Sequence, residues 1–403
     1  MVDCPHFDHH EILGDAERYG RYAELRACPV ARSEASGGFW ILSRHDEVAA
    51  AAEDWRTYSS AEGVLAPPPA GRRARQVALE QDPPDHTVYR KLYAELLSRP
   101  RVRAVEGDIR ANAADRLTVL AEATAGGEPA DFIAHVAAPV PIEALATLLG
   151  FDPHVTAQLR DLTVAELARI HRPAEEPADR PELTLMDLLR AQIDDRRERP
   201  RDDFATLLVR QDLPPIGILS FLVGAVIAGH ETTLIAATNL AYQLGADPAL
   251  QTRLRAEPHL IPRAVDESLR HRPPVQNFVR TLTRDVEHHG ATMRAGDKVM
   301  LLFGSANRDP DRWPGDPDRY DLDRHASDRD AGRHLAYGAG IHRCVGAFLA
   351  EVELHILTRE LLAYDLRLGR PDREPAFTPT TFGAFLTIDE LPVILTPTDP
   401  GQD

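Results

Sequence analysis

Apolar and polar positions alternate along the chain with two periods, and the helical period predominates. In residues 11–28, Leu13, Tyr19, Tyr22 and Leu25 fall on one side, as in an amphipathic helix. The same period predicts further helices at 45–53, in the proline-broken run 104–196, and at 214–245. Short apolar segments between turn residues predict strands within 29–44, 275–282, 291–307 and 379–396. Periodicity alone therefore predicts a large, α-rich protein.

The segment 214–245 is the most apolar part of the chain. Its apolar run, 216–229, is too short to span a membrane and is followed by polar residues, so we expect a central buried helix of a large domain. Gly229 costs about 1 kcal/mol relative to alanine inside a helix. A glycine followed by Glu231 and Thr232 is reasonable where a ligand presses on the helix. The alternative is that Thr232 bonds back to a helical carbonyl and Glu231 lies on the surface.

Composition narrows the class of protein. The 403 residues contain no linker, repeat or low-complexity run, so we expect one domain, 1–403, with poorly ordered ends at about 1–10 and 397–403. A net charge of −17 argues against a nucleic-acid partner. Three widely spaced cysteines suggest a reducing compartment and no disulfide framework. The N-terminal residues show no signal peptide, so we expect a cytoplasmic protein without a membrane anchor.

Candidate chemistry is concentrated in residues 334–351, where Cys344 lies in a loop with Gly338, Gly340 and Gly346 and a helical pattern follows. Glycines let the backbone approach a flat or bulky group. The positive end of the following helix favours a thiolate. A lone thiolate cannot complete a zinc site or an iron–sulfur cluster, but it can be the axial ligand of a haem iron. The alternative is a buried structural cysteine.

Residues 337–346, Tyr-Gly-Ala-Gly-Ile-His-Arg-Cys-Val-Gly, closely resemble the haem-binding loop of the cytochrome P450 family, Phe-Gly-x-Gly-x-His/Arg-x-Cys-x-Gly. Tyr337 replaces the usual phenylalanine. The resemblance implies that Cys344 binds the iron and that the loop contacts the cofactor through Tyr337, Gly338, His342, Cys344 and Gly346. We expect the Tyr337 hydroxyl to point outward, with at most a small effect on the haem potential.

Residues 228–233 resemble the family's oxygen-activation motif, Ala-Gly-x-Asp/Glu-Thr-Thr/Ser. Dioxygen must receive protons before its O–O bond breaks, and a hydroxyl with a neighbouring carboxylate can deliver them. The resemblance therefore implies catalytic roles for Glu231 and Thr232, and haem contacts for Ala228 and Gly229.

Three further motifs match the family in order. Asp-Pro-Pro-Asp-His at 82–86 ends in His86 and is followed four residues later by Arg90; these two residues share a helix face and are implied to bind a haem propionate. Arg280 is implied to bind a propionate as well, the alternative being an edge-strand arginine. Glu267, Arg270 and Arg319 are implied to form a buried structural triad. Substrate-pocket candidates are Val226, Ile227, Val275, Asn277, Phe278 and one of Phe382, Ala384 or Phe385.

The resemblance covers about residues 12–396 and implies a mainly α single large domain with a small β region, the cytochrome P450 fold. It implies a haem-thiolate monooxygenase that inserts one oxygen atom from O2 into a small organic substrate of bacterial secondary or catabolic metabolism. The cofactor would be haem b (iron-protoporphyrin IX). Electrons would come from NAD(P)H through a small ferredoxin and its reductase. The ferredoxin would dock on a monomer near Cys344, where Arg90, Lys91, Arg99, Arg101, Arg333 and Arg343 could form a basic patch.

Three alternatives share some of these motifs. One is an oxidative coupling or ring-forming enzyme acting on a peptide or a carrier-bound substrate. Another is a peroxide-driven enzyme, which would not need Glu231 and Thr232. The third, a non-catalytic haem-binding sensor, would tolerate loss of that pair.

Overall fold

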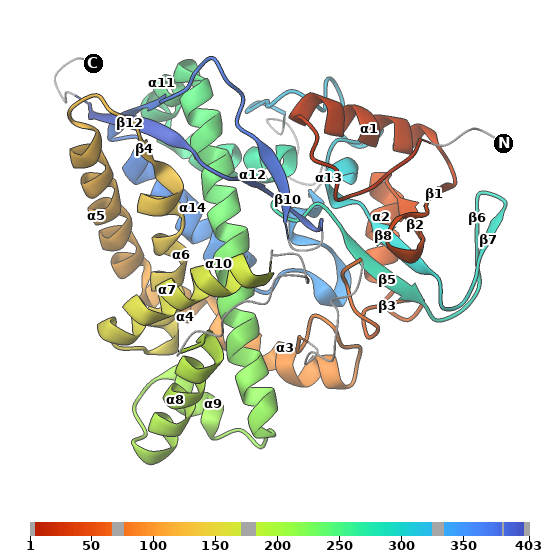
Figure 1. Cartoon of the computed structure of the whole chain (residues 1–403), viewed down its shortest axis with the longest axis horizontal. Coiled ribbons are helices and arrows are strands. Elements are labelled where there is room, and N and C mark those ends of the chain that lie inside the picture. Colours follow the sequence, from red (N-terminus) through yellow and green to blue (C-terminus); the bar gives the residue numbers. More distant parts are fainter. Residues whose placement is uncertain (1–4, 67–75, 171–182, 325–333, 381–382, 399–403) are drawn as a thin grey trace. The chain divides into compact units, whose positions relative to one another are not determined.

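The computed structural model describes residues 5–66, 76–170, 183–324, 334–380 and 383–398 (Figure 1). The chain forms two compact units. The first comprises Met1–Val88, Asp266–Cys344 and Ala376–Asp389, and the second comprises Tyr89–Val265, Val345–Pro375 and Glu390–Asp403. That the chain is a single domain stays a prediction, and the predicted disorder at the ends falls partly outside the described residues.

The first unit is built on a five-stranded sheet in the order β1-β2-β8-β5-β3. Its strands are β1 (Ala31–Ser33), β2 (Phe39–Leu42), β8 (Lys298–Leu301), β5 (Phe278–Leu282) and β3 (Tyr58–Ser59). Only the β2–β8 pair is parallel among these. One face packs on α1 (Asp15–Ala27) through Tyr22 and Leu25, and the other packs on α2 (His45–Glu53) through Val48. The hairpin of β6 (Val286–His288) and β7 (Ala291–Met293) extends from this sheet (Figure 1).

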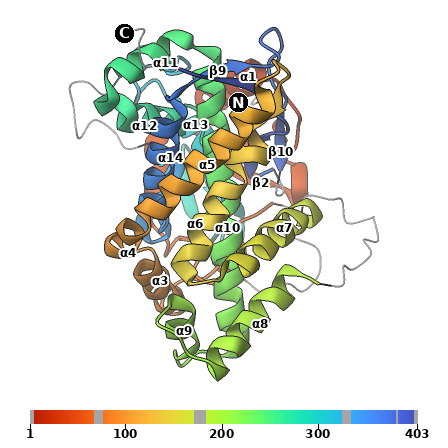
Figure 2. The same cartoon turned by 90° about the vertical axis from the view of Figure 1, so that its left-hand side faces the viewer.

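The second unit is helical, with α10 (Pro215–Ala246) as its longest described helix. In this unit α5, α6, α10 and α14 pack together (Figure 2). Its other elements are α4 (Arg99–Ala104), α5 (Glu106–Thr124), α6 (Pro139–Leu149), α7 (Pro153–Ile170), α8 (Leu185–Glu198), α9 (Phe204–Val209), α11 (Pro248–Ala256), α14 (Ala347–Leu361) and a sheet of β4 (Ala130–Asp131), β12 (Pro392–Pro397) and β9 (Tyr364–Leu368). Two helices cross the boundary between the units, α3 (Asp85–Leu96) and α12 (Ile261–His271).

Helix α10 confirms the expectation of a buried central helix. A proline occupies its first turn, where the missing N–H costs nothing. Among the described helices it alone is long and apolar enough to cross a membrane, but 56% of its apolar window is buried inside the protein. Burial of that apolar surface in the helical unit accounts for the composition.

Most predicted elements are confirmed, and the structure differs from expectation at three points. The segment 291–307 ends in a short helix, α13 (Phe303–Ala306), not in a strand. The strand region predicted at 379–396 is divided between two sheets, because β10 (Phe377–Thr380) pairs with β11 (Phe385–Ile388) while β12 pairs with β4 and β9. Alternation identifies a strand but not its partner. Cys28 is disulfide-bonded, which the expectation of no disulfide framework did not foresee.

Candidate active site

The loop before Cys344 is held by backbone hydrogen bonds and by one close approach. The backbone N–H of Cys344 donates to the carbonyl of Tyr337 at 2.8 Å, which closes the loop. Gly340 has φ +64°, and a Cβ there would lie 2.6 Å from the carbonyl oxygen of Ala52 at the end of α2. Only glycine fits this position without displacing that backbone.

The side chain of Cys344 is exposed, and the residue is not disulfide-bonded. Gly338 has φ +65°, and the space that its Cβ would occupy is open to 4 Å. An accessible sulfur beside an open glycine surface fits a broad, flat ligand such as haem. The structural alternative of a buried cysteine is therefore wrong.

Nitrogen-bearing side chains gather around Asp82 in the same unit. The rings of His86 and His342 meet edge to face with centroids 4.8 Å apart, and Nε2 of His342 lies 4.0 Å from Oδ1 of Asp82. Arg280, on β5, is 3% exposed. Burial lowers the pKa of Arg280 to about 10, and the charge of Asp82 only partly opposes this.

The partners of the buried Arg280 guanidinium indicate whether a haem propionate fits this site. Within the described part of the chain its side chain makes one hydrogen bond, from Nη1 to the Val279 carbonyl at 2.9 Å, and no carboxylate lies within ion-pair distance. A buried charge with so little compensation is costly. A ligand carboxylate such as a haem propionate would supply the missing counter-charge. Arg90, half-buried, lies one turn after His86 on α3 but belongs to the second unit.

The 228–233 motif lies in the middle of α10. Oγ1 of Thr232 donates to the Ala228 carbonyl at 2.8 Å, so the predicted back-bond exists, but the oxygen keeps its acceptor lone pairs. Ala228 is exposed and Thr232 half-buried, whereas Glu231 is 6% exposed. The alternative of a surface Glu231 is therefore wrong. A Cβ on Gly229 would make only an ordinary contact, 3.5 Å from Leu145, so the packing here does not itself require glycine.

His230 is the variable position inside this motif, and its residue type predicted no role. It is 1% exposed, and its Nε2 donates to the Ala138 carbonyl at 2.9 Å. Burial lowers the pKa of His230, so the ring is neutral at neutral pH. The imidazole thus ties α10 to the start of α6 beside the two predicted catalytic residues.

Glu267 and Arg270 form the predicted buried pair on α12. Two nitrogens of Arg270 donate to the two carboxylate oxygens of Glu267, each at 2.7 Å. The expected third member is wrong: the Arg319 side chain is exposed, and only its carbonyl takes part, accepting from Arg270 at 3.2 Å. Arg324 supplies the second guanidinium, 3.3 Å from Oε1 of Glu267. Both arginines follow the same Asp-rich turn, and spacing alone does not tell which one points inward.

The residues predicted to line a substrate pocket differ in their burial and in their contacts. Val275 and Phe385 are paired across a β-bridge, and the ring of Phe278 lies 6.3 Å from that of Phe385. These three are half-buried and form one apolar wall in the first unit. Asn277 is 3% exposed, and its amide donates to the Gly383 carbonyl at 2.9 Å.

Two other pocket candidates, Val226 and Ala384, are too deeply buried to line an open pocket. Val226 is 0% exposed and lies about 200° around the helix from Ala228, so the prediction that it lines a pocket is wrong. Ile227 is half-buried and remains a candidate. Ala384 is 1% exposed, and Phe382 lies outside the described residues.

Known proteins identify the class to which this fold and site belong. The family model for cytochrome P450 matches residues 167–394. The mycinamicin IV hydroxylase/epoxidase of Micromonospora griseorubida is 32% identical over 372 residues, covering 88% of this chain and 90% of that protein. The linalool 8-monooxygenase of Pseudomonas putida is 32% identical over 339 residues, covering 79% and 81%. The structure of cytochrome P450 CYP109Q5 from Chondromyces apiculatus has a TM-score of 0.82 at 27% identity, covering 98% and 99%.

This chain belongs to the cytochrome P450 family. It has the P450 fold, and it is a haem-thiolate monooxygenase, an oxidoreductase that binds haem iron through a cysteine thiolate. Its electrons come from external redox proteins. When bound, the haem supplies the redox chemistry that divides dioxygen between substrate and water.

Proposed function

We propose that Cys344 is the iron ligand of this monooxygenase and that its substrate is a small organic compound of bacterial secondary or catabolic metabolism. The observation that carries the assignment is the exposed sulfur in the glycine loop, beside the cluster of His86, His342 and Arg280. The test is the optical spectrum of the reduced protein under carbon monoxide. A red-shifted Soret band is expected for the wild type and its loss for Cys344→His; a wild-type spectrum without the shift would overturn the assignment.

His86, Arg90, Arg280 and His342 are proposed to hold the propionates. Arg280 contributes a buried positive charge, and a carboxylate against it forms a short charge-assisted hydrogen bond. His86 and His342 add imidazole N–H donors, and their rings meet edge to face. Faster transfer of haem to an acceptor such as apomyoglobin is expected for Arg280→Met than for wild type, with Arg294→Met on an exposed arginine as the matched control.

Thr232 and Glu231 are proposed to deliver protons in the active site. Because the Thr232 hydroxyl donates to the Ala228 carbonyl, its oxygen is an acceptor and can hold a water or a ligand O–H in a fixed position. Glu231 supplies a carboxylate that passes protons inward. Thr232→Val is therefore expected to consume reductant at a near-normal rate while forming less product, and Thr232→Ser is expected to keep product formation. Equal coupling in all three proteins would refute the role of the hydroxyl.

We propose a small ferredoxin with its reductase as the electron donor to a monomeric, cytoplasmic enzyme. Lys91 and Arg99 are exposed, and Arg101 is partly exposed. On a chain of net charge −17, these basic side chains support a local surface that attracts a negatively charged partner. Arg343, whose guanidinium lies 5.9 Å over the Tyr337 ring, is a further candidate, and Arg333 falls outside the described residues.

Charge reversal tests that surface. At low salt, Lys91→Glu with Arg99→Glu is expected to slow reduction by the ferredoxin, and added salt is expected to reduce the difference. Arg190→Glu, at an exposed arginine on α8, is the control. Unchanged reduction in the double variant would show that the donor docks elsewhere.

A further inference from the structure

Three metal-binding side chains meet in the first unit, outside the site described above. Glu47 comes from the first turn of α2, and His288 and His289 come from the tip of the β6–β7 hairpin. One ligand atom from each lies within 4.8 Å of the others. Nε2 of His289 donates to Oε1 of Glu47 at 2.9 Å, and the two imidazole centroids are 4.5 Å apart.

The backbone of the hairpin turn brings the two imidazoles to this position. The turn residues are His289 and Gly290, with φ of +47° and +82°. Two residues of positive φ make a type I′ turn, whose first position favours asparagine, aspartate or glycine. A histidine there keeps a less favoured backbone conformation while its ring reaches a carboxylate more than 200 positions earlier in the chain.

We propose that Glu47, His288 and His289 form a binding site for a divalent transition-metal ion, with zinc as the ion it takes in the cell. Two imidazoles and one carboxylate are ligands that zinc commonly takes together, with water in the fourth position. Zinc bonds of about 2.0–2.1 Å place tetrahedral ligand atoms about 3.3 Å apart. The Glu47 and His289 ligand atoms lie 2.9 Å apart, close to this spacing, and the half-buried His288 ring would have to move by about 1.5 Å or less to reach it.

The surrounding charges are compatible with the ion. His288 is half-buried, and zinc binds the neutral form of an imidazole. Arg44 is a nearby cation that opposes the metal, and its Nε donates to the Arg26 carbonyl at 2.9 Å. The Glu47 carboxylate compensates for part of the added positive charge.

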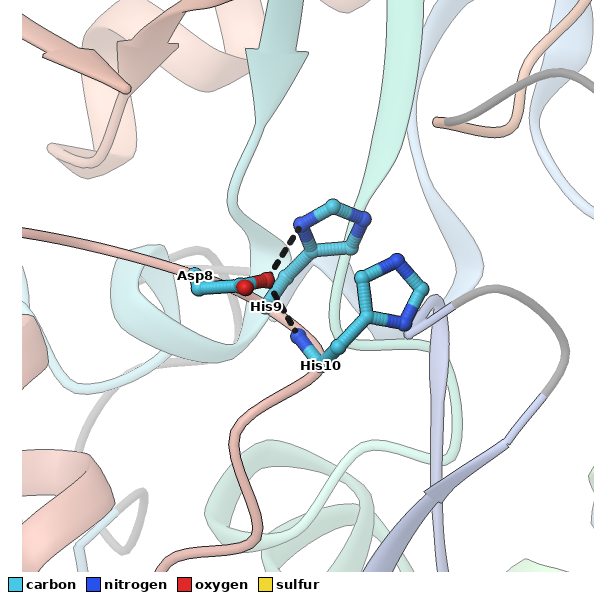
Figure 3. A group of neighbouring side chains, drawn as sticks. All are labelled: Asp8, His9 and His10. Atoms are coloured by element: carbon cyan, nitrogen blue, oxygen red, sulfur yellow. Dashed lines mark hydrogen bonds and ion pairs between the residues drawn. The ribbon is translucent and has the colours of Figure 1, made fainter. Parts of the chain in front are cut away.

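A second cluster, Asp8, His9 and His10, meets the same distance limit but is less suited to binding a metal ion (Figure 3). His9 is 2% exposed, and its Nε2 is occupied by the Ala66 carbonyl. Oδ1 of Asp8 already accepts from the backbone N–H of His10 at 3.0 Å. These three residues are consecutive in sequence, and two of them already use a ligand atom in a hydrogen bond. This cluster therefore serves as the matched control.

A bound ion would tie the hairpin to α2. The end of α2 in turn touches the cysteine loop, because Gly340 packs against Ala52 and Glu53. The metal site is therefore separate from the haem site but shares one helix with its support. Stabilisation of the hairpin and α2 is the role that this geometry gives the ion.

The test is calorimetric titration of ZnCl2 into the haem-loaded protein, purified without a polyhistidine tag and treated with EDTA. Wild type and His10→Ala are expected to bind one zinc ion with equal affinity. Glu47→Gln and His288→Ala are expected to bind it about tenfold or more weakly, since loss even of an outer-shell partner costs about 10–100-fold. An unchanged haem spectrum in each variant shows that folding is intact.

A second readout is the absorption of Co²⁺ in place of zinc. Intense tetrahedral bands in wild type that vanish in His288→Ala support the site. Zinc binding that is unchanged in Glu47→Gln and His288→Ala, or lost instead in His10→Ala, overturns the proposal. Absence of binding in wild type at millimolar zinc overturns it as well.

Discussion

Replacement of Arg324 by alanine is expected to destabilise the protein, whereas the same change at Arg319 is not. The Arg324 side chain is 4% exposed and forms an ion pair with Glu267, which is itself 1% exposed. Its guanidinium also donates to the carbonyls of Pro314, Asp316 and Arg319 at 3.0, 2.8 and 2.8 Å. Arg319 presents an exposed side chain and contributes only its backbone carbonyl.

The size of the expected loss in stability depends on the interactions that Glu267 keeps after Arg324→Ala. Removal of one partner from a buried ion pair costs about 3–5 kcal/mol. Glu267 would keep both hydrogen bonds from Arg270, so the lower end, about 3 kcal/mol, is expected for Arg324→Ala. Unfolding entropy of about 2.1 cal/mol/K per residue over 403 residues converts this into a fall of about 3.5 °C in Tm. Glu267→Gln leaves two buried guanidinium groups uncompensated and is expected to cost more.

The assay is thermal unfolding of the haem-loaded variants, followed by circular dichroism and by the Soret band. Arg319→Ala is the matched control and is expected to stay within about 0.5 kcal/mol of wild type, as exposed substitutions usually do. Equal destabilisation by both alanine variants, or an unchanged Tm for Arg324→Ala, would refute the assignment of Arg324 to the buried network.

Other predictions concern buried charges and the haem loop. Glu353, on α14, is 2% exposed, and neither carboxylate oxygen has a hydrogen-bond partner among the described residues; burial raises its pKa well above the ordinary value. Its contribution to stability is therefore full at pH below the unfolded-state pKa and is lost as pH rises through the folded-state pKa, so Glu353→Gln should flatten the pH dependence of Tm and raise Tm at neutral pH. No change in that profile would contradict a protonated, unbonded acid. Arg280→Met should stabilise the haem-free protein, by removing an uncompensated buried charge, yet weaken haem retention; a fall in both would indicate a purely structural arginine. Tyr337→Phe should change the haem potential little, as redox titration would show, and a large change would mean that the hydroxyl acts on the sulfur.

The predicted elements that the structure confirms are those whose hydrogen bonds join residues close together in sequence. Helix α2 has the predicted bounds, His45–Glu53, and α10 covers the predicted 214–245 within a residue or two. Helical hydrogen bonds link residues four apart, so spacing carries this information directly. The division of 379–396 between two sheets was missed, because strand partners are distant in sequence.

Sequence alone determined the class of protein, because the cysteine loop and the 228–233 motif each lie within one short segment whose spacing defines the chemistry. Tertiary structure decided which side chains meet across segments. Arg324 rather than Arg319 reaches Glu267, Asp82 lies among His342 and Arg280, and Glu47 meets the His288–His289 turn. Such contacts depend on the direction in which each side chain leaves its backbone and on packing between distant elements, and neither is recorded in the spacing of residues along one segment.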